Sequence, residues 1–155
     1  MLHVLPVIQQ NLTMTQRQFW AAIGHPLRAH PYAAILVAIA TNETLGDDAY
    51  TFADACCIVS ADDGHGVLQL TSSWPINWTD PRASAEYAIE HFIEPAGDYW
   101  EPLAADTSSL VRLIAATYNE GLGAAIRWHD RGNVDGGTTN DYAARALTVY
   151  ERITT

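Results

Sequence analysis

The sequence contains no lysine, so its positive side chains are eight arginines, set against eighteen aspartates and glutamates. The formal net charge is −10 at neutral pH. Nucleic-acid binding depends on clustered lysines and arginines that meet phosphates, and the sequence has no such cluster. Electrostatic capture by anionic membranes or walls is disfavoured for the same reason. We therefore expect no nucleic-acid partner, and any anionic partner must be held by local contacts.

Long apolar runs are also missing. No run reaches the roughly 18–20 apolar residues of a membrane span, so we expect no stable membrane insertion. The first residues lack a basic segment and a clear cleavage site, which argues against a signal peptide. The two cysteines, Cys56 and Cys57, are adjacent, and neighbouring cysteines pair only with strain. The six histidines do not follow metalloprotease spacing, so we expect neither a metal nor another cofactor.

What is present is a chain of 155 residues with 48% hydrophobic side chains, enough for a single domain over residues 1–155 with a real core. From residue 47 to residue 71 the helical period is lost, which favours loops and a short strand or hairpin. The predicted fold class is therefore mainly α, a helical domain with a small loop or β region. Apolar spacing, caps, prolines and glycines predict helices over 15–23, 31–44, 107–119 and 122–130, and one that Asn140 caps. They also predict a helix over 81–94, with the Asp80-Pro81 pair at its start, Phe92 on its apolar face and Pro95 as its end.

Glu43 closes the apolar run ILVAIATNETLG, residues 35–46, and is the only charged side chain between Arg28 and Asp47. It can be read as a solvated residue in a last helical turn. However, the C-terminal end of a helix disfavours an ionised carboxylate, and partial burial does so too. Both effects raise the pKa of a carboxyl group, and a carboxyl that is protonated near neutral pH suits a general acid.

Two further segments carry polar groups that can line a cleft, one within an otherwise apolar strand-like stretch and one at a helix end. In ADDGHGVLQLT, residues 61–71, the glycines permit tight turns, and the amide of Gln69 must find a partner or line a cleft. In AATYNEGLGAA, residues 115–125, Tyr118 and Asn119 come where a helix ends and can project into a cleft. Each segment also has a plain structural interpretation, as a glycine-rich loop before a strand and as a helix stop signal.

Taken in order, the three segments resemble the SLT-type lytic transglycosylase and goose-type lysozyme families. The family motifs are Glu-Ser, Gly-Leu-Met-Gln-Leu and Ala-Tyr-Asn-x-Gly, followed by a terminal helix with tyrosines. Here Thr44 replaces the serine, and Val67 and Leu68 replace the leucine and methionine. The resemblance covers residues 32–152 and implies a lysozyme-like α+β fold, with the loop or β region beside an active-site cleft.

The resemblance also implies a reaction and roles for individual residues. The substrate would be the glycan strands of peptidoglycan, cut at the β-1,4 bond between N-acetylmuramic acid and N-acetylglucosamine. Glu43 would protonate the glycosidic oxygen. Tyr118 would hydrogen-bond near Glu43 and orient it, while Asn119 would hold acetamido groups of the substrate. The sugar cleft would be lined by Gln69 and the backbone near Gly66 to Leu68.

One departure from the family bears on the chemistry. Residues 47–59 lengthen the gap between Glu43 and Gln69, and we expect them to enlarge the loop region over the cleft. The stretch DDGHG at 62–66 resembles a goose-type segment in which an aspartate helps to position a water. Asp62 is the candidate base and Asp63 the second choice, although both could simply form a turn. An inverting hydrolase needs such a carboxylate, whereas a lytic transglycosylase uses the 6-hydroxyl of the substrate itself.

Three functions therefore remain open: a hydrolysing muramidase, a lytic transglycosylase, and a non-catalytic glycan-binding or virion structural module. Retention of Glu43 beside the other motifs favours an enzyme, and we expect it to act as a monomer. Peptidoglycan lies outside the cytoplasm. Without a signal peptide, the protein would reach the bacterial wall through a holin, as part of a virion, or through a secretion machine.

Overall fold

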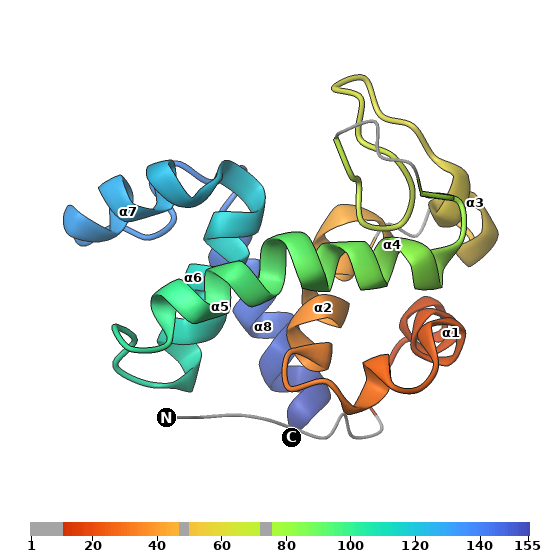
Figure 1. Cartoon of the computed structure of the whole chain (residues 1–155), viewed down its shortest axis with the longest axis horizontal. Helices are drawn as coiled ribbons and strands as arrows, with labels where there is room; N and C mark the ends of the chain where they lie inside the picture. Colours follow the sequence, from red (N-terminus) through yellow and green to blue (C-terminus); the bar gives the residue numbers. More distant parts are fainter. Residues whose placement is uncertain (1–10, 47–49, 72–75) are drawn as a thin grey trace.

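The computed structural model describes residues 11–46, 50–71 and 76–155, and these are mainly helical, as predicted. In Figure 1, α4 and α5 run as one long rod across the molecule, while α2 and α8 lie behind it. None of the helices in the described ranges combines the length and apolar character needed to cross a membrane. The α-helices are α1 (Met14–Ile23), α2 (Ala33–Ala40), α3 (Phe52–Cys57), α4 (Pro81–Ala88), α5 (Glu94–Trp100), α6 (Thr107–Glu120), α7 (Leu122–Asp130) and α8 (Tyr142–Thr154).

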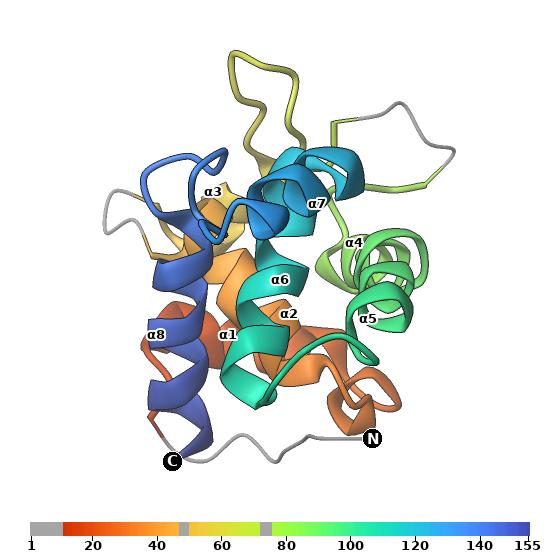
Figure 2. The same ribbon diagram turned by 90° about the vertical axis from the view of Figure 1, so that its left-hand side faces the viewer.

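Helix α2 is the centre of the core. All of its residues are buried, because α1, α6 and α8 pack around it (Figure 2). A helix that is apolar on every face is stable only when it is enclosed in this way. The predicted helix over 31–44 is thus confirmed in its position, but its last turn widens into the π-helical turn η2 (Thr41–Leu45). That turn closes with a hydrogen bond of 2.9 Å from the Gly46 amide to the Thr41 carbonyl.

The prediction that Pro95 ends its helix is wrong. Helix α4 passes through a second π-helical turn, η3 (Ile89–Ile93), and continues directly as α5. Proline removes an amide donor and crowds the preceding turn, so it is best tolerated in the first turn of a helix. The π turn breaks the regular bonding just before Pro95 and places it in the first turn of α5. The chain can therefore continue helical through to Trp100.

The predicted cap of the last helix is also wrong. Asp141, not Asn140, occupies the N-cap position of α8, and its side chain makes no capping hydrogen bond. The carboxylate of Asp135 takes over this role, because its Oδ1 accepts the amides of Ala143 and Ala144 at 2.9 and 3.3 Å. Its Oδ2 accepts a hydrogen bond of 3.2 Å from Arg112 of α6. One partly buried carboxylate thus caps α8 and ties it to α6.

The predicted β region is not a sheet in the described residues. Residues 58–71 form turns, joined by two isolated antiparallel bridges in which His65 pairs with Val59 and with Leu70. Of the segment 47–59, which we expected to enlarge the loop region, residues 52–57 form α3 and residues 47–49 lie outside the described ranges. The expected absence of a signal sequence concerns residues 1–10, which also lie outside them.

Candidate functional site

Glu43 lies in the π turn that follows the central helix, where its carboxyl is largely enclosed by protein. Burial raises the pKa of this carboxyl from its ordinary value of 4.5 to about 7, as the sequence led us to expect. Of the smaller influences on this pKa, the Tyr142 hydroxyl lowers it, the charge of Asp62 raises it and Arg145 lowers it. Near neutral pH, Glu43 is therefore divided between a protonated and an ionised form.

Two side chains of α8 accompany this carboxyl. The buried Tyr142 hydroxyl lies close enough to Glu43 to lower the pKa of Glu43, although within the described ranges no bond of ordinary geometry satisfies that hydroxyl. Burial and the Glu43 charge raise the pKa of Tyr142 well above its usual value, so it remains a neutral phenol. The Arg145 guanidinium lies over the Tyr142 ring, 5.7 Å from its centroid. Together these two residues partly stabilise a negative charge on Glu43.

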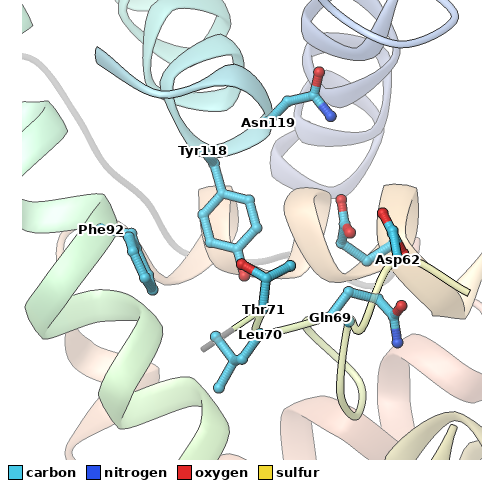
Figure 3. A pocket seen from close by; sticks show the side chains of 9 residues that line it. Asp62, Gln69, Leu70, Thr71, Phe92, Tyr118 and Asn119 are labelled. Carbon is cyan, nitrogen blue, oxygen red and sulfur yellow. The ribbon is translucent and has the colours of Figure 1, made fainter. Parts of the chain in front are cut away.

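Glu43 opens into a pocket of about 190 Å³ between the helices and the 58–71 turns. In Figure 3, Phe92 and Tyr118 stand on one side of this pocket, and Asp62 and Gln69 stand on the other. Asn119 lies above them at the end of α6. The pocket thus brings together residues that are far apart in the sequence. It is lined by Glu43, Asp62, Gly64, Gln69, Leu70, Thr71, Phe92, Tyr118 and Asn119.

Two hydroxyl groups hold the turn before Gln69 by consecutive backbone carbonyls. Thr44, beside Glu43, donates to the Val67 carbonyl at 2.8 Å, and Tyr118 of α6 donates to the Leu68 carbonyl at 2.6 Å. Tyr118 was predicted to bond near Glu43, but its single proton is committed to Leu68. Burial and then the Glu43 charge raise the pKa of Tyr118 well above its usual value. Tyr118 therefore anchors the turn that faces Glu43.

Gly66 and Leu68, whose backbone was predicted to line the cleft, are not among the residues that line the pocket. The Leu68 side chain is fully buried in the core, so only its backbone takes part in the site. Gly66 is buried as well, with a φ of +74°, and an added Cβ would lie 2.6 Å from the Trp78 carbonyl oxygen. Glycine is needed at this position for the close approach of two backbones. The glycine that lines the pocket is Gly64.

Gln69 lines the pocket as predicted, and its backbone takes an unusual conformation to do so. Its φ is +51°, a left-handed value that favours glycine. The side-chain amide donates to the Gly66 carbonyl at 2.9 Å, which closes a tight local turn. An energetically costly backbone of this kind is found most often at functional sites.

The two candidate bases differ in position. Asp62 lines the pocket, and a hydrogen bond from Ser60 is the main reason why the pKa of Asp62 lies below its usual range. Asp62 is therefore ionised at neutral pH. Asp63 has a φ of +66° and lies 3.5 Å from the ring of His65, and it is not among the residues that line the pocket. The geometry favours Asp62 over Asp63 as a partner of Glu43.

Asn119 also lines the pocket as predicted. Its Oδ1 accepts the amide of Thr139 at 3.0 Å, which joins the end of α6 to the loop before α8.

In the chain as described, no cluster of three or more histidine, cysteine or acidic side chains could hold a metal ion. Cys56, which is buried, and Cys57, which is exposed, are free thiols.

No family model, curated protein or solved structure matches this chain. A function can therefore be inferred only from the chemistry of the pocket. The Glu43 carboxyl, which is partly protonated near neutral pH, shares the pocket with the ionised carboxylate of Asp62. Two amide side chains and two aromatic rings line the same pocket. Such a pair of carboxyl groups, with pKa values pushed apart by their surroundings, can serve as acid and base.

Sequence reasoning missed several members of the site. Phe92 was assigned to the buried face of its helix, and the π turn η3 carries it to the pocket. Leu70 and Thr71 were read only as part of a motif. Arg145 gave no sequence signal, because its position depends on the packing of α8 against η2.

Proposed function

We propose that this protein is a muramidase that cleaves the β-1,4 bond between N-acetylmuramic acid and N-acetylglucosamine in peptidoglycan. The observation that carries the proposal is the Glu43 carboxyl, whose pKa is raised to about 7 and which opens into a polar pocket shared with Asp62. The order of the motifs around Glu43, Gln69 and Asn119 resembles that of lysozyme-like enzymes and supports the same assignment. The finer fold that we propose is the lysozyme-like α+β arrangement.

In the proposed reaction Glu43 begins in its protonated form and donates its proton to the glycosidic oxygen. The bond to the anomeric carbon then breaks through an oxocarbenium-like transition state. Asp62 is ionised and takes a proton from a water that attacks the anomeric carbon from the opposite face of the sugar. The two carboxyl groups thereby exchange protonation states, and solvent restores them. This is an inverting hydrolysis, in which water supplies the new hydroxyl group.

The other lining residues suit an N-acetylated sugar. Asn119 and Gln69 present amide side chains, which can pair with acetamido groups through donors and acceptors. Phe92 stands beside Tyr118, with ring centroids 5.8 Å apart, and offers an apolar surface to a sugar face. The bonds from Thr44 and Tyr118 to the turn at Val67 and Leu68 keep Gln69 in a fixed position relative to Glu43.

A lytic transglycosylase is the second candidate. Asp62 is exposed and bound by Ser60 within its own turn, which suits a purely structural aspartate. In this reaction the substrate's 6-hydroxyl attacks and releases a 1,6-anhydro sugar, so no second carboxylate is needed. Digestion of purified peptidoglycan, followed by mass spectrometry of the products, distinguishes the two reactions. Muramidase products carry a reducing end, whereas anhydro products are lighter by one water. Asp62→Asn should abolish hydrolysis but leave a transglycosylase active.

The proposal implies that the protein meets peptidoglycan at the bacterial wall. Release through a holin, carriage in a virion and injection by a secretion machine are the routes that we propose. A non-catalytic glycan-binding or virion structural module would bind purified walls without clearing them. Loss of turbidity in a wall suspension, compared between the wild type and Glu43→Gln, separates that role from an enzyme.

A further inference from the structure

A second hollow shares Glu43 with the first pocket. It lies between the π turn η2 and α8 and has a volume of about 750 Å³. Asn42, Glu43 and Thr44 line it from the turn, and Arg145 and Thr148 line it from the helix. Because Glu43 borders both hollows, a substrate held at Glu43 in the first pocket lies next to the second. The proposed reaction uses only the first pocket.

Arg145 is the one cationic side chain among the described residues that line this second hollow. Backbone carbonyls hold its guanidinium in place, because Nε donates to Asn140 at 2.8 Å and an Nη donates to Thr139 at 3.3 Å. A third, longer bond of 3.5 Å reaches the side chain of Asn42. Within the described ranges, no carboxylate lies within salt-bridge distance of Arg145.

These bonds leave part of the guanidinium available to a ligand. The group carries more N–H donors than the three bonds use, and they are arranged as a planar fork that matches a carboxylate. In a chain of net charge −10, a fixed guanidinium whose charge is opposed, among the residues described, only by the partly protonated Glu43, with no salt bridge, is a local site for an anion. The protonated form of Glu43 is uncharged, so it does not repel an anion that binds beside it.

We infer that the second hollow is an anion subsite in which Arg145 binds a carboxylate of the peptide stems attached to the glycan. The inference rests on the proposed function, since it assigns a further part of the same substrate. Stem peptides carry free carboxylates, whereas the sugar rings of the glycan backbone are neutral. The subsite would therefore make the protein prefer strands that carry peptides over bare N-acetylglucosamine polymers.

Binding tests this inference without depending on turnover. The protein is the full chain with Glu43→Gln, and the ligand is a peptidoglycan tetrasaccharide with its stem peptides, measured by titration calorimetry. The matched ligand is the same fragment with the stem carboxylates converted to amides. Adding Arg145→Gln should weaken binding of the free-acid fragment roughly tenfold and leave binding of the amidated fragment unchanged. Arg145→Lys should recover part of the loss, because it restores the charge but not the fork.

The control is Arg28→Gln, which removes the same charge from an exposed residue of η1 (Leu27–Ala29), before the opposite end of α2. It should change neither affinity. If adding Arg145→Gln left the affinity for both fragments unchanged, or weakened both equally, the inference would be overturned. Lack of binding by either fragment, together with no wall cleavage by the wild type, would overturn the proposed function as well. Thermal unfolding of each variant shows whether a loss of affinity reflects a loss of fold, and Arg145→Lys then decides.

Discussion

The raised pKa of Glu43 predicts that removing its charge stabilises the protein at alkaline pH. The carboxyl titrates at about 7 in the folded chain and near 4.5 when unperturbed. Each pKa unit corresponds to about 1.4 kcal/mol, so a fully ionised Glu43 costs on the order of 3 kcal/mol of the free energy of unfolding. Glu43→Gln keeps the shape and removes the charge. The variant should therefore gain about 3 kcal/mol over the wild type above pH 8, while losing activity.

The direction of this pH dependence follows from the number of protons that Glu43 binds in the folded and unfolded states. Between pH 4.5 and about 7 the folded state binds more protons at Glu43 than the unfolded state does, so the stability of the wild type falls as pH rises. The stability that the protonated Glu43 carboxyl contributes is fully present below its pKa in the unfolded chain and is lost as pH rises through its pKa in the folded chain. Urea unfolding of both proteins from about pH 4 to about pH 9 measures the difference. Glu151→Gln, from an exposed position on α8, is the control for loss of one charge. A difference in unfolding free energy between wild type and Glu43→Gln that stays constant over this range would show that the pKa of Glu43 is not raised by folding.

Three other predictions concern the groups around Glu43. Wall clearing should decline as pH rises through about 7, because Glu43 then loses the proton that it donates. Since Arg145 lowers the pKa of Glu43, Arg145→Gln should move this decline to higher pH. A pH–rate profile of both proteins measures the shift. Tyr118→Phe removes the donor to the Leu68 carbonyl and should cost about 1–2 kcal/mol of unfolding free energy, measured in urea, together with part of the activity. Asp135→Ala should cost about 2–3 kcal/mol in the same assay, because it uncaps α8, whereas Asp135→Asn should cost less.

The sequence predicted those parts of the fold that depend on local patterns. The apolar run before Glu43 indicated a buried helix, and the Asp80-Pro81 pair marked the start of α4, where the Asp80 side chain accepts the Arg82 amide. The errors arose where a distant contact overrides a local signal. Asn140 looked like a cap, but the carboxylate of Asp135 reaches α8 from the preceding loop.

The candidate site shows the same division. Gln69 could be predicted because its amide stands in an otherwise apolar stretch, and Asn119 because it is a polar residue at the end of a helix. Tyr118 was expected to bond near Glu43, but the acceptor of its hydroxyl proton, the Leu68 carbonyl 2.6 Å away, could not be read from the sequence because it depends on how the turn packs against α6. Arg145 could not be found from the sequence, since only the packing of α8 brings it to the turn that carries Glu43.

We propose above all that Glu43 is the acid that cleaves the glycan. The most direct test is the release of soluble muropeptides from purified peptidoglycan at about pH 6 by the wild type and by Glu43→Gln, quantified by mass spectrometry. The wild type should release disaccharide-peptide fragments, and Glu43→Gln should release them at least about a hundredfold more slowly while remaining folded. Equal release by the two proteins would show that Glu43 is not the acid, and no release by the wild type would show that the protein does not cleave peptidoglycan.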